Sequence, residues 1–164
     1  GGVARERATS VSGLDHLEGE SVLILAEGAT HATKTVSSGA VTLDRPSSKV
    51  HIGLSYTSDF QMLRLDVGAQ DGTSQGKFVR FHRVIFRFLQ MLGGFIGPDT
   101  DNLDEIVLRE GGDPMDTPVP LFTGDYEIEW DGAYDGDNHI FYRQTQPLPV
   151  TIEAVMPQMH TQDR

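Results

Sequence analysis

The sequence contains no cysteine, which excludes disulfide bonds, cysteine metal ligands and cysteine nucleophiles. It also has no apolar run that approaches the ~20 residues a helix needs to cross a bilayer. The longest apolar run, residues 84–96, is interrupted by Arg87, Gln90 and two glycines. We therefore expect no membrane insertion. The chain opens with Gly1-Gly2 and has no initiator methionine, so we expect residues 1–12 to be a tag remnant or a linker.

Basic residues are scarce in residues 99–137, which hold thirteen carboxylates and a single base, Arg109. This stretch, which we call the acidic segment, therefore accounts for the whole of the net charge of −11, and the rest of the chain is close to neutral. Tight binding of free nucleic acid depends on lysine and arginine side chains that displace counterions, so this charge argues against it. Passage of DNA without adhesion remains compatible with such a surface.

The basic residues that are present gather in a short aromatic run, KFVRFHRVIFRF at residues 77–88. Exposed arginine and phenylalanine side chains could contact nucleic acid. The alternative is that the arginines pair with carboxylates of the same chain or of another subunit, a role that suits the guanidinium fork. We favour pairing, and predict an interface at Arg80, His82, Arg83 and Arg87.

Short runs of Val, Ile, Thr and Phe between turns predict an all-β fold, an antiparallel sandwich or small barrel of about 8–10 short strands with long acidic loops. SVLILA at 21–26 is typical of a buried strand, and Ser37-Ser38-Gly39 of a hairpin turn. Residues 60–67 alternate polar and apolar side chains, which predicts a half-buried strand with Leu63, Leu65 and Val67 on its apolar face. We expect one domain over residues 13–157 and a flexible tail over 158–164.

The basic run has apolar residues at both odd and even positions, so a strand there is expected to be covered on both faces. A helix over 84–92 is the alternative, but it would be short and weakly capped before Gly93-Gly94. We favour the strand.

Catalytic motifs are weak in this chain. Residues 72–76 match G-x-S-x-G, but the nucleophile elbow needs a following helix, and here a strand is expected. Ser74 is interpreted as a turn residue. A pair of carboxylates could cleave glycosides, but only at a spatial separation that the sequence does not define. We predict no enzyme activity.

Metal ligands are also poorly spaced. The six histidines show no H-x-H or H-x-x-x-H pattern that would bring two imidazoles to one zinc ion. The pairs Asp99/Asp101 and Asp135/Asp137 offer oxygens of the kind calcium prefers, but neither continues into a calcium-binding loop. We interpret both as solvated acidic loops and predict no cofactor.

Six stretches together resemble a known family: GLDHLEGESV (13–22), LAEG (25–28), VHIGLSYTS (50–58), PLFTGD (120–125), QPLP (146–149) and MP (156–157). The sequence is similar to the C-terminal part of the tail nozzle, or tail tubular, proteins of short-tailed bacteriophages. This resemblance implies a non-enzymatic virion protein that forms a ring, usually a hexamer, beneath the portal and adaptor proteins and near tail fibre proteins, and that guides DNA out of the capsid. It also implies that the natural protein is longer.

Within this setting, the acidic segment is expected to form a surface that faces or rims the DNA path. Its predicted members are Asp99, Asp101, Asp104, Glu127, Glu129, Asp131, Asp135 and Asp137. Two other classes remain open. One is a module in which the loops at 99–120 and 131–139 bind a host receptor or glycan, and the other is an enzyme that cleaves cell-wall polymer.

Overall fold

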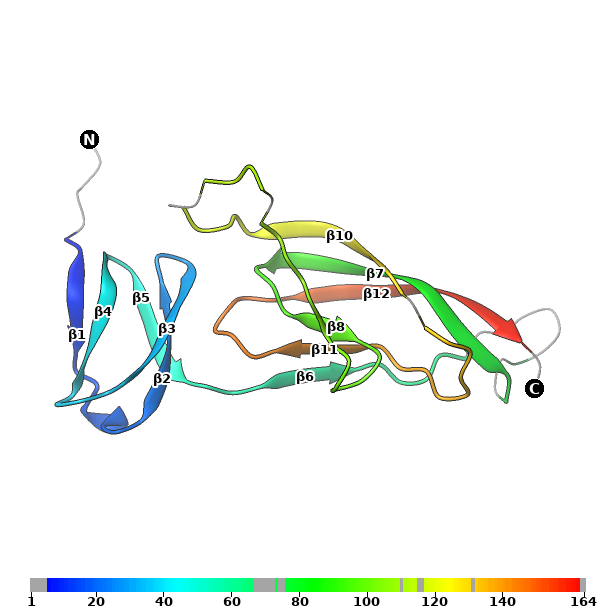
Figure 1. Cartoon of the computed structure of the whole chain (residues 1–164), viewed down its shortest axis with the longest axis horizontal. Coiled ribbons are helices and arrows are strands. Elements are labelled where there is room, and N and C mark those ends of the chain that lie inside the picture. Colours follow the sequence, from blue (N-terminus) through cyan, green and yellow to red (C-terminus); the bar gives the residue numbers. More distant parts are fainter. Residues whose placement is uncertain are drawn as a thin grey trace. The chain divides into compact units, whose positions relative to one another are not determined.

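The computed structural model describes residues 6–66, 73, 76–109, 111–114, 117–130 and 132–162. These residues form twelve strands and one 3₁₀ turn, Asp15–Leu17, with no α-helix among them. Every strand pair is antiparallel, and none of the four sheets closes into a barrel within the described part. The predicted all-β class is confirmed, and the arrangement is consistent with a sandwich. The chain divides into two compact units, which Figure 1 shows with their strands labelled.

Unit 1 comprises residues 1–57, 109–120 and 145–148. It has a two-stranded sheet of β1 and β4 and a three-stranded sheet in the order β3-β2-β5. Its core is purely aliphatic and includes Val22, Ile24 and Leu43. The strand bounds are β1 Ala8–Ser12, β2 Ser21–Ala26, β3 Ala29–Thr35, β4 Ala40–Ser47 and β5 Val50–Leu54.

Two tight turns in unit 1 each have two consecutive residues with positive φ, the geometry of type I′ turns. They are Glu27-Gly28, with φ of 55° and 81°, and Ser38-Gly39, with φ of 55° and 64°. Ser37 and Ala40 close the second turn by reciprocal backbone hydrogen bonds. The turn predicted there is present, and its glycine accepts positive φ without steric cost, but β3 and β4 on either side of it belong to different sheets.

Unit 2 comprises residues 58–108, 121–144 and 149–164. It contains a three-stranded sheet, β10-β7-β12, and a four-stranded sheet, β6-β11-β8-β9, which form separate layers in Figure 1. The core draws on both sheets, with Phe86 and Phe88 from β7, Ile96 from β8 and Tyr142 from β11. The strand bounds are β6 Ser58–Gln61, β7 Phe78–Met91, β8 Phe95–Gly97, β9 Asp104–Glu105, β10 Phe122–Glu129, β11 Phe141–Gln144 and β12 Ile152–Gln162.

The strand predicted for the basic run is present as β7, but the prediction that both its faces are covered is wrong. Arg83 and Arg87 lie on an outer face, with side chains 40% and 48% exposed. The change in parity comes from irregular pairing: Phe81 and Arg83 lie opposite Met159 and Gln158, so β7 carries one extra residue, His82. Such a β-bulge shifts the following side chains to the other face. Val79 and Phe81 before the bulge and Val84, Phe86 and Phe88 after it therefore point into one core, whereas Leu89 is 40% exposed.

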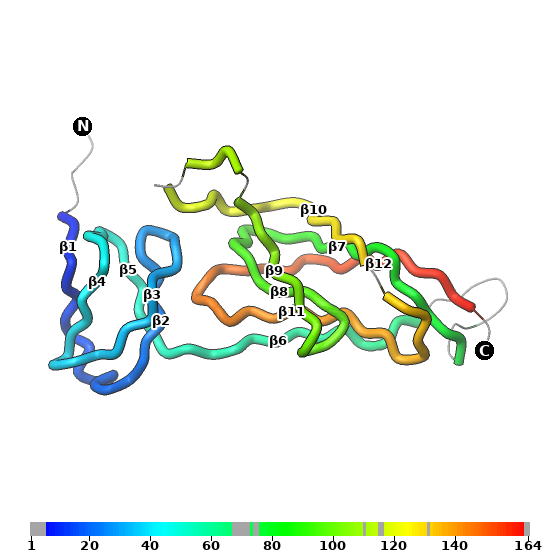
Figure 2. Tube along the Cα trace, in the orientation of Figure 1, coloured from blue at the N-terminus to red at the C-terminus, as the bar shows by residue number. Residues whose placement is uncertain are grey.

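Between β7 and β8 the chain turns a corner at Gly93-Gly94, where the trace in Figure 2 folds back. Both glycines have large positive φ, 136° and 142°. The Tyr142 hydroxyl donates to the Gly93 carbonyl at 2.7 Å, and Gln144 Nε2 donates to the same oxygen at 3.1 Å. A Cβ on Gly94 would collide with the Tyr142 ring. The corner therefore needs glycine because a buried tyrosine lies directly against the backbone.

The strand predicted over 60–67 is largely wrong. β6 ends at Gln61 with all four residues exposed, residues 62–66 form no strand, and Val67 lies outside the described residues. Met62 still donates to the Ile140 carbonyl, and Met62 and Leu65 both pack against the core, although they are three residues apart. Leu63, placed on the apolar face by its alternation, is 88% exposed. Period-two alternation does not apply once the backbone leaves the extended conformation.

The structure also differs from the expected domain limits. The segment assigned to a tag remnant or linker contains β1, which pairs with β4, and the segment assigned to a flexible tail contains the end of β12. In place of one domain over 13–157, two units form around two separate hydrophobic clusters. Two apolar clusters that share no residue give the chain two centres of packing, and the segments 109–120 and 145–148 return to unit 1.

Candidate functional site

The predicted basic and acidic residues meet on the outer face of the β10-β7-β12 sheet. Antiparallel pairing places Asp125 of β10 directly opposite Arg87 of β7. Arg87 donates to both oxygens of Asp125, through Nε at 2.7 Å and through Nη2 at 2.9 Å. Arg83 Nη1 lies 3.0 Å from Glu127 Oε1. For Arg83 and Arg87, the intramolecular alternative of the predicted pairing is thus the one found.

The Arg87–Asp125 pair changes the acidity of both partners. Hydrogen bonding from Arg87 holds the pKa of Asp125 below its usual value. The same hydrogen bond raises the pKa of Arg87, and the charge of Glu153 on β12 adds to this increase. Both side chains are about half exposed, so solvent screens the pair. This ion pair therefore adds little to the free energy of folding, and its main effect is to orient β7 and β10 relative to each other.

Arg80 and His82 behave differently from the other two predicted interface residues. Arg80 lies opposite His160 of β12, and its buried Nε has no hydrogen-bond partner. His82, the bulge residue, stacks on His160 with ring centroids 4.7 Å apart and an interplanar angle of 25°. Its buried Nδ1 also has no partner. None of the described ion pairs involves Arg80, His82 or His160.

The predicted acidic surface is dispersed over several elements. Asp99 closes a local turn after β8, because its carboxylate accepts hydrogen bonds from the Asp101 and Asn102 amides at 2.8 and 2.9 Å. Hydrogen bonds from the Asn102 side chain, and then those from the two amides, lower the pKa of Asp99. Asp101 and Asp104 are exposed. Asp99 is therefore a structural turn residue.

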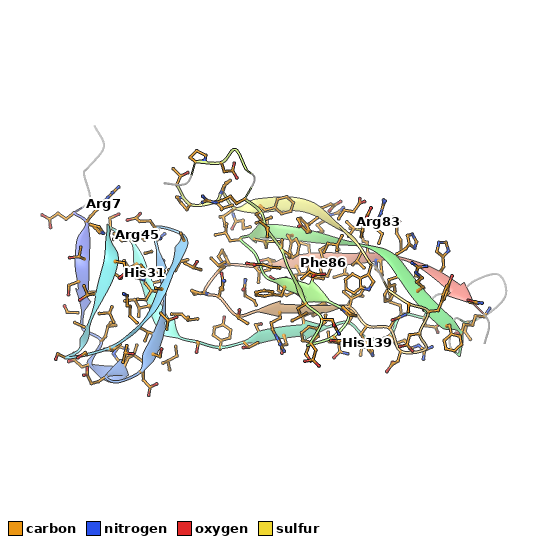
Figure 3. The ribbon with its side chains drawn as sticks, in the orientation of Figure 1. Arg7, His31, Arg45, Arg83, Phe86 and His139 are labelled. Carbon is orange, nitrogen blue, oxygen red and sulfur yellow. The ribbon has the colours of Figure 1, made fainter. Side chains whose placement is uncertain are left out.

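The remaining predicted acids lie on β10 and on the loop that follows it. Glu129 is exposed at the end of β10, and Asp135 exchanges two backbone hydrogen bonds with Val79. Asp137 Oδ1 lies 3.1 Å from His139 Nε2, a residue labelled in Figure 3. Asp131 lies outside the described residues. The structure thus brings Glu127 and Glu129 onto one strand face, with Asp104 on β9 and the other described acids on separate loops.

The ion pair between β6 and β11 was not predicted from the sequence. Arg143 of β11 donates to both oxygens of Asp59 of β6, at 2.8 and 2.9 Å, and its guanidinium lies 5.3 Å from the centre of the Phe141 ring. Hydrogen bonding from Arg143 lowers the pKa of Asp59. The two residues are 84 positions apart, so only the strand pairing brings them together.

The structure bears on the predictions about metal binding, the Ser74 motif and membrane insertion only in part. Within the described ranges no group of three or more histidine and carboxylate side chains is placed to hold a metal ion. Ser74, the serine of the G-x-S-x-G pattern, lies outside the described residues. None of the described helical residues forms a segment long and apolar enough to span a bilayer.

Comparison with known proteins does not assign the chain to a family. No protein-family model matches the chain, and no curated protein matches it.

Proposed function

We propose that this chain is a structural part of a bacteriophage tail, of the nozzle or tail tubular type, which acts through contacts between subunits in the virion. The proposal rests on the resemblance described above, and the all-β architecture is compatible with it. Its partners would be other copies in a ring of about six, portal or adaptor proteins, tail fibre proteins and DNA in transit.

The observation that carries the proposal is the open edge of β12. This strand of eleven residues pairs with β7 along one side, and no described strand pairs with its other side. An unpaired strand edge presents N–H and C=O groups that can bind a strand of another chain. Pro157 removes one donor from the middle of this edge. Pairing between copies would therefore be concentrated at residues 152–156 and 158–162.

The charge distribution supports the proposed path for DNA. Asp101, Asp104 and Glu129 are exposed, and their side chains form no hydrogen bond or ion pair with other described residues. Carboxylates of this kind repel phosphate groups and limit adhesion. Glu127 contributes less to such a surface because Arg83 offsets its charge.

The absence of cysteine makes a direct test of the β12 edge possible. A Gln158→Cys variant carries a unique, exposed thiol on this edge, and Thr42→Cys on β4 is a matched control in unit 1. If β12 lies at a subunit boundary, a short bis-maleimide cross-links copies through position 158 and much less through position 42. Equal cross-linking at the two positions would indicate random collision and contradict the edge contact.

The function itself is tested on the complete gene product. We expect light scattering to show a ring-sized oligomer and mass spectrometry to detect the protein in purified virions. A complete protein that stays monomeric and is missing from virions would overturn the proposal. A neighbouring portal or adaptor gene would support it.

A further inference from the structure

Unit 1 contains a pocket of about 450 Å³ at the turn between β2 and β3. Its walls come from the end of β2, the turn residue Glu27, the β4 residues Arg45 and Pro46, and the described residues Arg109, Thr117 and Pro118. Figure 3 shows two of its arginines, Arg7 and Arg45, at the same end of the unit. The pocket is lined by Arg7, Ala26, Glu27, Ala29, Arg45, Pro46, Arg109, Thr117 and Pro118. Its volume lies within the range of sites for small organic ligands.

The lining is basic although the chain as a whole is acidic. Three arginines line the pocket, and Glu27 is its only described carboxylate. Glu27 is already engaged, because it accepts hydrogen bonds from the Ser48 hydroxyl at 2.7 Å and the Lys49 amide at 3.2 Å, and also from the Ser48 amide. These hydrogen bonds lower the pKa of Glu27, and the bond from the Ser48 hydroxyl has the largest effect. Among the described lining residues, one carboxylate therefore faces three guanidinium groups, and this lining carries a net positive charge.

The three guanidinium groups are held to different degrees. Arg109 donates to the carbonyls of Pro114 at 3.3 Å and Thr117 at 2.9 Å, which orients its side chain. Arg45 reaches only the Ala26 carbonyl, at 3.5 Å. Arg7 forms no hydrogen bond or ion pair with any residue that the structure describes. Arg7 and Arg45 thus keep most of their donors available to a ligand.

We propose that this pocket binds a small organic ligand through an oxyanion, a carboxylate or a phosphate group. Arginine binds both groups through two parallel N–H donors. The Thr117 hydroxyl adds a polar contact, and the rings of Pro46 and Pro118 supply apolar walls against which the body of a monosaccharide-sized molecule can pack. This site does not depend on the proposed tail function, because the pocket is formed entirely by unit 1.

The experiment titrates the full chain with three probes of similar size: glucuronate, glucose 6-phosphate and glucose. Calorimetry or amide chemical shifts measure binding, and the two anions distinguish a carboxylate ligand from a phosphate ligand. We expect at least one anion to bind more tightly than glucose, with an affinity that falls as salt is added. Arg7→Gln and Arg45→Gln should each weaken that binding on the order of tenfold, the loss of one charged hydrogen-bond pair.

Arg64→Gln is the matched control, because it removes the same charge from unit 2. Arg7 is exposed, so its substitution should leave the fold intact, which thermal unfolding checks. Binding of an anion that the two pocket variants weaken and the control preserves supports the site. Absence of binding to the folded wild-type chain, equal binding of glucose, or an equal loss in Arg64→Gln would each overturn it.

Discussion

The two units of this chain stabilise their strands in different ways. Unit 1 has short strands, an aliphatic core and tight turns held by carboxylates: Glu18 accepts hydrogen bonds from the Ser38 and Gly39 amides at 2.9 and 2.7 Å, and Glu27 closes the turn at Ser48. Unit 2 has a strand of fourteen residues, an aromatic core and a glycine corner covered by Tyr142. Carboxylates also act in unit 2, at the turn of Asp99 and in the pairs of Asp59 and Asp125, so the clearest difference between the units is the core, which is aliphatic in unit 1 and aromatic in unit 2.

The largest expected effect is the loss of an aromatic ring from unit 2. Phe86 is fully buried and lies 5.6 Å from Phe88 and 6.5 Å from Tyr142, measured between ring centroids. Phe86→Ala should lower the free energy of unfolding by about 3–5 kcal/mol, since it removes apolar contacts and leaves a cavity. The fluorescence of Trp130, the only tryptophan and a member of this core, follows unfolding of unit 2 in urea.

Leu89→Ala is the control for Phe86, because Leu89 lies on the same strand and is 40% exposed. It should change the Trp130 transition far less. Equal shifts for the two variants would contradict a core centred on the aromatic residues.

The matching change in unit 1 is Ile24→Ala. Ile24 is 1% exposed at the centre of β2, and its truncation should cost about 2–5 kcal/mol. Amide hydrogen exchange across β2 and β5 measures the loss, and the Trp130 transition should keep its midpoint if each unit unfolds around its own core. A shifted Trp130 midpoint would mean that the two cores unfold together.

A smaller effect is expected at the glycine corner. Burial raises the pKa of Tyr142 to about 12, so its hydroxyl stays protonated and donates to Gly93 throughout the neutral range. Tyr142→Phe should cost about 1 kcal/mol, because the Gly93 carbonyl still accepts a hydrogen bond from Gln144. Denaturation followed by Trp130 checks this value. A loss as large as that of Phe86→Ala would show that the hydroxyl organises the whole corner.

The turn at Ser38-Gly39 of unit 1 should be sensitive to acid. Backbone hydrogen bonds lower the pKa of Glu18, with the Gly39 amide as the largest cause, so this carboxylate stabilises the folded state above the pKa of the unfolded chain. That stability is lost as the pH falls through the lower pKa of the folded state, beneath the ordinary value of 4.5. Glu18→Gln should reduce stability at neutral pH and flatten its decline in acid.

Hydrogen exchange of the Ser38 and Gly39 amides as a function of pH measures the acid response of this turn. Glu20→Gln provides the control, since it removes the same charge two residues further along the chain, directly before β2. If both variants give the same pH profile, the acid response comes from net charge, and the hydrogen bonds of Glu18 to the turn do not contribute to it.

The smallest effect is expected for the ion pair on the outer face of unit 2. A double-mutant cycle with Arg87→Gln and Asp125→Asn should give a small coupling free energy that decreases with added salt, because both side chains are half exposed. Urea unfolding at two salt concentrations measures it. A coupling that salt does not change would show that the pair is shielded from solvent.

Local features of the fold were predictable from the sequence wherever the cause is local. Ser38-Gly39 forms a turn because glycine accepts positive φ, and β7 extends because its β-branched and aromatic residues favour a strand. The bulge at His82 was not predictable, since a single extra residue leaves no mark beyond the change of parity that we interpreted as two covered faces. The same applies to residues 62–66, where alternation continues after the strand has ended.

The candidate sites divide in the same way. The sequence indicated that arginines of the basic run pair with carboxylates, but it did not select the partners, and it did not reveal the pair of Arg143 with Asp59. The pocket at Arg7, Arg45 and Arg109 was also missed, because its arginines are far apart in the chain and none belongs to the basic run.

By itself, the sequence determined the all-β class, the tight turns and the concentration of negative charge in residues 99–137, since composition and neighbouring residues produce these properties. Only the tertiary structure decided that β10 lies beside β7, which joins the acidic segment to the basic run, and that the chain has two cores. The physical reason is that strand order and register depend on packing between distant segments, and the identity of neighbouring residues does not specify it.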